Sequence, residues 1–334
     1  MQCIDNSYVG DRIFLLAATI LAILVNYSKA TNMDIHVVPV PASSHPHIMA
    51  HRGCCANGFG GHAPENTILA FEYAHSVGAM MFETDLWFTS DRNIVIMHDN
   101  TLDRTTNCTG LISNWTLAEI QNQCEAGSWL DPKFVDTKVP SLQDLLSFVA
   151  ESGMTCVLDL KERGLMQTIV RAAELTSNLD MSQLVASINY YNDTKDVVTR
   201  LKRSTILLNP SADSPIPTDI KGLSGANYFG DLREVGIDVI FPTYSMTSPS
   251  IVELGLAAAR YGVQLWAFTI DAPQDLIGAA VAGVRTVCTN DPKGALSMYQ
   301  ATQDCMKDEC KLPNFFKAES QINYMDTDSY SSAD

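Results

Sequence analysis

The hydrophobic pattern of the chain repeats as short apolar runs separated by segments with helical periodicity. The apolar runs are rich in β-branched residues and have the length of buried strands. They lie near residues 47–52, 80–86, 154–160, 184–189, 205–209, 238–243, 264–270 and 285–290. Helical spacing appears near 65–77, 141–152, 165–176, 193–203, 231–236, 249–261, 273–281 and 292–301. Strands that alternate with helices predict a parallel sheet, and eight such units predict an α/β fold of the (β/α)₈ TIM barrel type.

One further apolar run, Ile94–Met97, does not fit this alternation. Only the segment 90–93 separates it from the end of the second strand, whereas a parallel crossover needs about a dozen residues or more. We therefore expect this run to fold back as an antiparallel hairpin on an extension of the second strand. The fold-back would return His98 toward Glu83 and Asp85.

Residues 100–140 then interrupt the barrel, and an insertion at this end of a barrel is expected to form a small cap or a wall of the pocket. Cys108 with Cys124 inside it, and Cys305 with Cys310 near the other end of the chain, are plausible local disulfides. Cys156 and Cys288 lie within predicted strands, and we expect them to be buried thiols.

The two ends of the chain differ from the barrel region. Residues 13–25 form an apolar run too short for a membrane span, which needs roughly 20 residues. We expect residues 1–30 to be a signal peptide of a secreted protein, although the flank lacks a positive excess, so a retained anchor or a buried helix stays open. The barrel domain would cover residues 31–302, and residues 303–334 would form an acidic, largely disordered tail.

Composition narrows the range of partners. The chain has 334 residues and a formal net charge of −16, so its surface repels polyanions and nucleic acid is not an expected partner. A small anionic substrate would need local cations. No protein partner is inferred. Three N-glycosylation triplets agree with secretion, and they begin at Asn107, Asn114 and Asn192.

Acidic side chains follow the apolar runs in a pattern that suits a metal ion. Glu83 and Asp85 are two positions apart, so on a strand both carboxylates point to the same face. Asp159 ends the next barrel strand, with Lys161 two residues further on. Hard oxygen ligands of this kind suit Ca²⁺ or Mg²⁺ as a divalent metal cofactor. The alternatives are a solvated acidic strand and a simple ion pair between Asp159 and Lys161.

The remaining candidates are bases and cations near the same strand ends. His51 and His98 are candidate acid–base catalysts, because imidazole titrates near neutral pH. Arg52 is a candidate phosphate clamp, or a structural partner of Glu65 or of the acids. A set of further residues is placed near the barrel mouth, either lining the pocket or holding the structure: Glu65, Asn66 and Trp266.

Together these motifs resemble the glycerophosphodiester phosphodiesterase family. The matching pieces are His51-Arg52-Gly53, Pro64-Glu65-Asn66-Thr67, Glu83-Thr84-Asp85, His98-Asp99 and Leu102-Asp103-Arg104-Thr105-Thr106. The resemblance implies a TIM barrel with an inserted segment after the second strand. It also implies hydrolysis of a small glycerophosphodiester to glycerol 3-phosphate and an alcohol. Arg52 and Lys161 would then bind the phosphate, and a substrate hydroxyl or a water would attack phosphorus.

Two features depart from the family pattern. The family usually has Glu where this chain has Asp159, so ligation directly or through a water both stay open. The loop from Cys54 to Ala63 is several residues longer than usual, which could narrow the entrance and change the preferred alcohol group.

Two other functions are considered. A lysophospholipase D or sphingomyelinase D-like activity on a membrane-lipid substrate is one, because phospholipase D-like toxins resemble this barrel and place an Asp at the third ligand position. The run Arg104-Thr105-Thr106 favours the glycerophosphodiesterase family instead. A non-catalytic secreted barrel is the other, and the presence of both histidines and of the paired acids argues against it.

Overall fold

The computed structural model describes residues 46–188, 206–208, 223–244 and 250–307. Eight of the strands in this part are parallel and follow one another around a ring. Their bounds are β1 His47–Ala50, β2 Met81–Phe88, β4 Thr155–Leu160, β5 Leu184–Ile188, β6 Ile206–Leu208, β7 Val239–Ile240, β8 Gln264–Ala267 and β9 Thr286–Thr289. The first strand pairs with both β2 and β9, which closes the ring and confirms the predicted TIM barrel.

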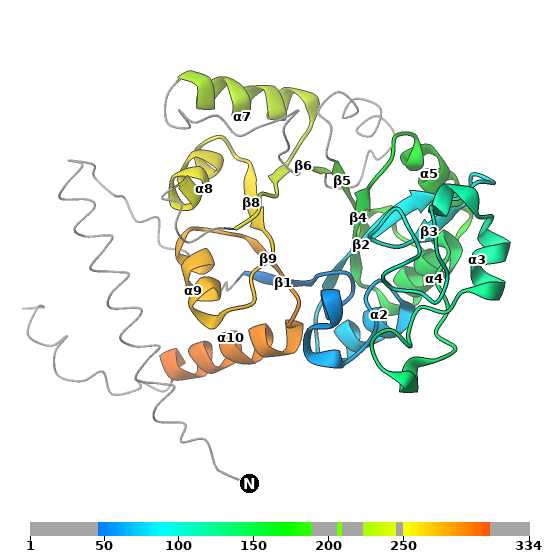
Figure 1. The fold of residues 1–334 in the computed structure, drawn as a ribbon. Coiled ribbons are helices and arrows are strands. Elements are labelled where there is room, and N and C mark those ends of the chain that lie inside the picture. Colours follow the sequence, from blue (N-terminus) through cyan, green and yellow to red (C-terminus); the bar gives the residue numbers. More distant parts are fainter. Residues whose placement is uncertain (1–45, 189–205, 209–222, 245–249, 308–334) are drawn as a thin grey trace, which may run out of the picture. The chain divides into compact units, whose positions relative to one another are not determined.

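Helices lie around the outside of these strands (Figure 1). The α-helices of the described barrel are α2 Ile68–Ser76, α4 Leu142–Ser152, α5 Leu165–Leu175, α7 Leu223–Val235, α8 Ser250–Arg260, α9 Pro273–Val281 and α10 Pro292–Lys307. The helix predicted at 231–236 begins earlier, at Leu223, and the helix predicted at 193–203 falls outside the described residues. The last helix runs past the predicted domain boundary at residue 302.

Helix α2 begins at Ile68, later than the predicted start at residue 65. Thr67 is its N-cap, with extended backbone angles and a side-chain oxygen that accepts a hydrogen bond from the backbone N–H of Ala70. Asn66 has a positive φ of 55°, which is incompatible with an α-helical turn. Glu65 and Asn66 therefore belong to the loop that enters the helix, and both side chains are buried.

The apolar run Ile94–Met97, which does not fit the alternation of strands and helices, forms the predicted hairpin. β3, Ile94–Ile96, pairs antiparallel with β2, and Ile96 lies opposite Leu86. The backbone N–H of Met97 then donates to the carbonyl oxygen of Asp85, at 3.0 Å. The residue that follows Met97 is His98, so the hairpin returns this histidine to the strand that carries the acids.

The ring of strands encloses an apolar core cluster. Its buried members are Met49, Met81, Val157, Val185, Val239, Phe241, Trp266 and Cys288. Trp266 is only 6% exposed, and its Nε1 donates to the side chain of Gln264 two residues earlier on β8. Trp266 was expected either to line the pocket or to hold the structure, and it is a core residue. Cys156 and Cys288 are buried free thiols, as predicted.

The insertion at 100–140 has a small core of its own. It contains α3 Leu117–Gln123 and the short 3₁₀ turns η2 Ile112–Asn114 and η3 Pro132–Phe134. Its apolar residues pack in one cluster with Val95 and Met97 of the hairpin. Cys108 and Cys124 form the predicted disulfide inside this cluster. The insertion is therefore anchored to the strand extension that carries His98.

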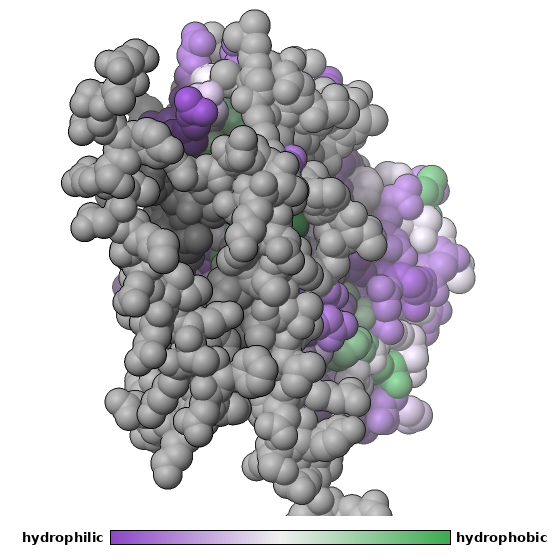
Figure 2. All heavy atoms as spheres, turned by 90° about the vertical axis from the view of Figure 1, so that its left-hand side faces the viewer, coloured by the Kyte–Doolittle hydropathy of each residue, from purple (hydrophilic) through white to green (hydrophobic). Residues whose placement is uncertain are grey.

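Two compact units are distinguished, residues 1–296 and 297–334, and all residues of the candidate site belong to the first. The predicted signal peptide, the tail from 308 onward, Asn192 and Cys310 lie outside the described residues. Among the described helices, none is both long enough and apolar enough to cross a membrane. On the face shown in Figure 2, the described residues in view are mostly hydrophilic, with separate apolar spots.

Candidate active site

Three carboxylates converge where the middle of β2 runs beside the carboxyl end of β4. The strand register pairs Asp85 with Asp159, and Glu83 lies two residues earlier on the same face of β2. One oxygen from each of the three lies within 4.8 Å of the others, and all three residues are buried. Burial, followed by the charges of Asp85 and Asp159, raises the pKa of the Glu83 carboxyl well above its usual range.

Glu83, Asp85 and Asp159 together form what we call the acid cluster. Among the ion pairs of the described residues, those of Lys161 bring a cation closest to this cluster. Its Nζ lies 2.5 Å from Oδ2 of Asp159 and 2.8 Å from Oδ1 of Asp85. Burial disfavours its ammonium form, but the charges of Asp85 and Asp159 outweigh burial and raise the pKa of Lys161. Burial also opposes ionisation of Asp85, but Lys161, His98 and Arg52 outweigh it and lower the pKa of this carboxyl. The ion pair between Asp159 and Lys161, which was considered as an alternative to a metal site, therefore exists within the acid cluster.

Arg52 lies in a tight turn directly after β1. Its backbone N–H donates to Oε2 of Glu83 at 3.0 Å, and its Nη1 donates to Oε1 of Glu65 at 2.9 Å. Its Nε lies 3.8 Å from Oδ2 of Asp85. Gly53 follows with a φ of +82°, and a Cβ there would meet a ring carbon of Phe71 at 2.5 Å. The turn needs glycine for both reasons, and it aims the guanidinium toward the acids.

Asn66 joins the loop before α2 to the acid strand. Its Nδ2 donates to Oδ2 of Asp85 at 2.8 Å, and its Oδ1 accepts from the hydroxyl of Thr84 at 2.7 Å. Together with Glu65, which holds Arg52, it shows that the Pro64-Glu65-Asn66-Thr67 motif orients the groups around the acid cluster. Neither residue was assigned a definite role from the sequence.

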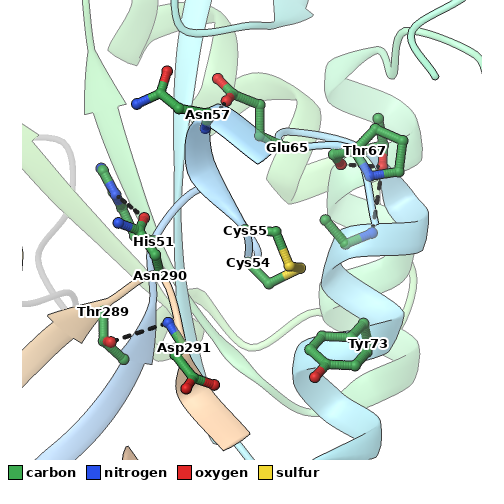
Figure 3. Close-up of a disulfide and its surroundings, with 12 residues drawn as sticks. His51, Cys54, Cys55, Asn57, Glu65, Thr67, Tyr73, Thr289, Asn290 and Asp291 are labelled. Atoms are coloured by element: carbon green, nitrogen blue, oxygen red, sulfur yellow. Dashed lines mark hydrogen bonds between the residues drawn. A yellow bond between two sulfur atoms is a disulfide. The ribbon is translucent and has the colours of Figure 1, made fainter. Parts of the chain in front are cut away.

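His51 stands at the end of β1 with both ring nitrogens near other polar groups. Its Nδ1 lies 2.8 Å from Oδ1 of Asn290, a residue that follows β9 (Figure 3). Its Nε2 lies 4.0 Å from Oε2 of Glu83. Burial, followed by the positive charge of Arg52, lowers the pKa of His51 from 6.5 to about 4. The ring is therefore neutral near pH 7, which leaves one nitrogen able to accept a proton.

His98 is held by an acid and, through it, by an arginine. Its Nδ1 lies 2.7 Å from Oδ1 of Asp99, and Nε of Arg104 donates to Oδ2 of the same carboxylate at 2.7 Å. The hydrogen bond from Arg104, with that from His98, lowers the pKa of Asp99 to about 2 despite partial burial. Arg104 also donates to both carboxylate oxygens of Glu65. One arginine in the insertion thus connects His98 to the residue that holds Arg52.

Sequence reasoning missed a disulfide beside His51. Cys54 and Cys55 are adjacent in the sequence and bonded to each other, and both are fully buried (Figure 3). The loop that follows contains the 3₁₀ turn η1, Ala56–Gly61, and the backbone N–H of Asn57 donates to Glu65. The long loop from Cys54 to Ala63 is thus held at its start by the disulfide. Only the doublet of cysteines itself could have indicated this bond.

The donor set of the acid cluster fits a hard divalent cation. Three buried carboxylates within mutual reach supply oxygen ligands, and one of them, Glu83, is disfavoured as an anion by burial and by the charges of the other two. A divalent cation would relieve this repulsion, and Mg²⁺ or Ca²⁺ commonly completes its coordination with water or substrate oxygens. The acid cluster is thus suited to hold a divalent cation beside Arg52 and His51.

Comparison with known proteins gives the same picture. The pattern of the Glycerophosphoryl diester phosphodiesterase family matches residues 51–294. The chain is 28% identical over 260 residues to a glycerophosphodiester phosphodiesterase of Caldanaerobacter subterraneus subsp. tengcongensis, which covers 76% of this chain and 97% of the relative. It is 31% identical over 175 residues to glycerophosphodiester phosphodiesterase 1 of Homo sapiens, which covers 49% of this chain and 51% of the relative.

Among solved structures, an Oleispira antarctica phosphodiesterase in complex with the product sn-glycerol-3-phosphate is similar with a TM-score of 0.63 and 25% identity. The likeness covers 76% of this chain and 97% of that one. A glycerophosphodiester phosphodiesterase of Thermotoga maritima, at 18% identity and a TM-score of 0.58, shares the fold. The family match spans most of the chain and includes both histidines and all three acids. The chain belongs to the glycerophosphoryl diester phosphodiesterase family and is a phosphodiesterase of that class.

Proposed function

We propose that the protein hydrolyses a glycerophosphodiester to sn-glycerol 3-phosphate and an alcohol, with a divalent metal and two histidines that carry opposed proton roles. The observation that carries this proposal is the convergence of His51, Arg52 and the acid cluster around Glu83 at one end of the barrel. The product bound to the Oleispira antarctica relative supports the same substrate class.

Glu83, Asp85 and Asp159 would hold the metal, which is Mg²⁺ or Ca²⁺. When bound, a divalent cation polarises a phosphoryl oxygen and stabilises the charge that develops on it. Asp85 already has three further partners in Asn66, Lys161 and Arg52, so its carboxylate is oriented before any ligand arrives. Such pre-orientation lowers the cost of assembling the site.

Arg52 and Lys161 would bind the phosphate oxygens. Each cation lies against the acid cluster and is largely withdrawn from water, with side-chain exposures of 9% and 17%. Charge-assisted hydrogen bonds to phosphate are stronger in such a site than at the surface. Arg52 keeps its bond to Glu65 through Nη1, so its other nitrogens are the ones that would turn to substrate.

His51 would act as the general base and His98 as the general acid. The lowered pKa of about 4 keeps His51 neutral at pH 7, so it can take a proton from the attacking hydroxyl or water. His98 contacts the ionised Asp99, which holds the ring in one orientation in the way that a triad aspartate does. The leaving alkoxide would receive its proton from His98.

A substrate panel tests the proposal. Glycerophosphocholine, glycerophosphoethanolamine, glycerophosphoinositol and lysophosphatidylcholine would each be incubated with the full chain, with and without EDTA. We expect glycerol 3-phosphate from the glycerophosphodiesters, loss of this activity in EDTA, and recovery with Mg²⁺ or Ca²⁺. Turnover of lysophosphatidylcholine alone would refute the proposed substrate, and full activity in EDTA would refute the metal.

We also propose that the protein enters the secretory pathway. The disulfide Cys108–Cys124 is typical of an oxidising compartment, and the triplet asparagines Asn107 and Asn114 are exposed. Peptide-N-glycosidase treatment of protein expressed in a eukaryotic host, followed by intact mass measurement, checks this. A mass that does not change on treatment and that includes Met1 would contradict it.

A further inference from the structure

A chain of hydrogen bonds outside the acid cluster links Asp271 through Asn290 to His51. Asp271 follows β8, and its Oδ1 accepts from the backbone N–H of Asn290 at 2.7 Å and from the hydroxyl of Thr289 at 2.9 Å. Its Oδ2 accepts from Nδ2 of Asn290 at 2.8 Å. Oδ1 of Asn290 lies 2.8 Å from Nδ1 of His51 (Figure 3). Asp271 and His51 are thus joined through a single amide.

Donor and acceptor chemistry leaves one arrangement for this chain of hydrogen bonds. A carboxylate only accepts hydrogen bonds, so the amide group beside Oδ2 of Asp271 is the NH₂ of Asn290. This orientation turns the amide oxygen, which only accepts, toward His51. Nδ1 of His51 must then carry a hydrogen, and in the neutral ring the lone pair lies on Nε2. Nε2 is the nitrogen on the side of Glu83.

We propose that Asp271 is a positioning residue for the phosphodiesterase reaction, acting through Asn290 to hold His51 in the Nδ1–H tautomer. This inference rests on the proposed role of His51 as the general base. With the hydrogen on Nε2 instead, the nitrogen that faces the acid cluster would have no lone pair to take a proton. Asp271 follows β8 and His51 follows β1, so neighbouring sequence gives no hint of the link.

The substitution Asp271→Asn separates tautomer control from simple loss of contact. The introduced amide oxygen can still accept from Thr289 and from the backbone of Asn290, but its NH₂ would face the NH₂ of Asn290. Two donors cannot pair, so the Asn290 amide is expected to turn over and present its NH₂ to His51. Nδ1 would then have to accept, and the hydrogen would move to Nε2. We expect kcat to fall on the order of 10²-fold with KM little changed.

Two matched variants control for structural damage. The double exchange Asp271→Asn with Asn290→Asp puts a carboxylate at position 290, beside His51, and an amide at position 271. A carboxylate only accepts, so Nδ1 of His51 must again carry the hydrogen. We expect this variant to recover most of the wild-type kcat. Thr289→Val removes the hydrogen bond that Thr289 donates to Oδ1 of Asp271 and leaves Oδ2, which holds the Asn290 amide, unchanged. It should keep the wild-type tautomer.

The tautomer is read directly from imidazole ¹⁵N chemical shifts of the full chain, labelled at histidine, with Mg²⁺ present. The His51 signals are assigned by their absence in His51→Gln. We expect Nδ1–H in wild type, in the double exchange and in Thr289→Val, and Nε2–H in Asp271→Asn. Nε2–H in wild type would overturn the proposal, and this measurement does not depend on whether Asp271→Asn folds. Nδ1–H in Asp271→Asn would also overturn it. Tautomers as expected with an unchanged kcat would support the positioning and refute His51 as the base.

Discussion

Asp85 on β2 and Asp159 on β4 are register partners in adjacent parallel strands, so their carboxylates stand side by side at the barrel mouth. Lys161 lies against both, with its Nζ 2.8 Å from Asp85 and 2.5 Å from Asp159. Glu83 adds a third carboxylate, and burial with the two neighbouring acids raises its pKa. Lys161 thus neutralises part of the negative charge of the acid cluster, and a divalent cation would neutralise the rest.

Replacing one of the acids tests this metal site. Asp85→Asn is nearly isosteric and removes one charge from the acid cluster, so we expect Mg²⁺ or Ca²⁺ binding to disappear and activity to fall by a factor on the order of 10² or more. Isothermal titration calorimetry with each metal measures the binding. Asp131→Asn, at an acid of the insertion whose side chain is 44% exposed, is the control and should bind metal as wild type does. Unchanged metal affinity in Asp85→Asn would place the metal elsewhere.

The two histidines are expected to act as a pair. His51→Ala and His98→Ala should each lower kcat by a factor of about 10² to 10⁴, the usual contribution of a general acid or base. The double variant should lose less than the product of the single losses, because groups that act as a unit are not additive. His75→Ala alters an exposed histidine of α2 and should leave kcat unchanged. Wild-type turnover in folded His98→Ala would remove this residue from the mechanism.

The pH dependence of folding stability reports on His51. Burial lowers the pKa of His51 from 6.5 to about 4 in the folded chain, so between these values the unfolded chain binds more protons. Stability is therefore fully present above pH 6.5 and is lost as the pH falls toward 4, by roughly 3 kcal/mol from this group. Urea denaturation in EDTA at pH 7.5 and pH 4.5 should show a smaller loss in His51→Gln than in wild type. Equal losses would contradict the burial of a neutral ring.

Arg104 is expected to matter for catalysis although it lies in the insertion. It donates to both oxygens of Asp99 and of Glu65, a geometry that lysine cannot reproduce. We expect Arg104→Lys to lower kcat about tenfold, equivalent to about 1.4 kcal/mol, because Asp99 no longer orients His98. Arg92→Lys, at an arginine stacked on Phe88, is the matched control. Equal effects of the two variants on kcat would argue against an orienting role.

The disulfide Cys108–Cys124 is expected to stabilise the insertion. The two cysteines are 16 residues apart, and closing a loop of about this length is worth about 3 kcal/mol in the chain-entropy description. The double change Cys108→Ala with Cys124→Ala should increase hydrogen exchange in α3 and the loops around it, while β4 and β5 stay protected. Uniform exchange in wild type and variant would show that the apolar cluster alone holds the insertion.

Much of the fold was determined by the sequence alone. The alternation of apolar runs with helical segments predicts the eight parallel strands, because parallel pairing requires long crossovers. The hairpin at Ile94–Ile96 follows from the same rule, since the connection before it is too short for a crossover. The spacing of Glu83 and Asp85 predicts their common face, and the strand order predicts that Asp159 joins them. These inferences rest on local periodicity and chain connectivity, which sequence contains.

Only the tertiary structure decided how these groups are held. The partners of His51 and Arg52 come from Asn290 and Glu65, and Asp271 reaches the site from a third segment. Such contacts depend on the angle and register of strands that are far apart in the chain, and no local pattern contains that information. The place of Trp266 in the core rather than the pocket was decided the same way. On a barrel strand, the layer in which an inward side chain lies depends on the stagger of all its neighbours.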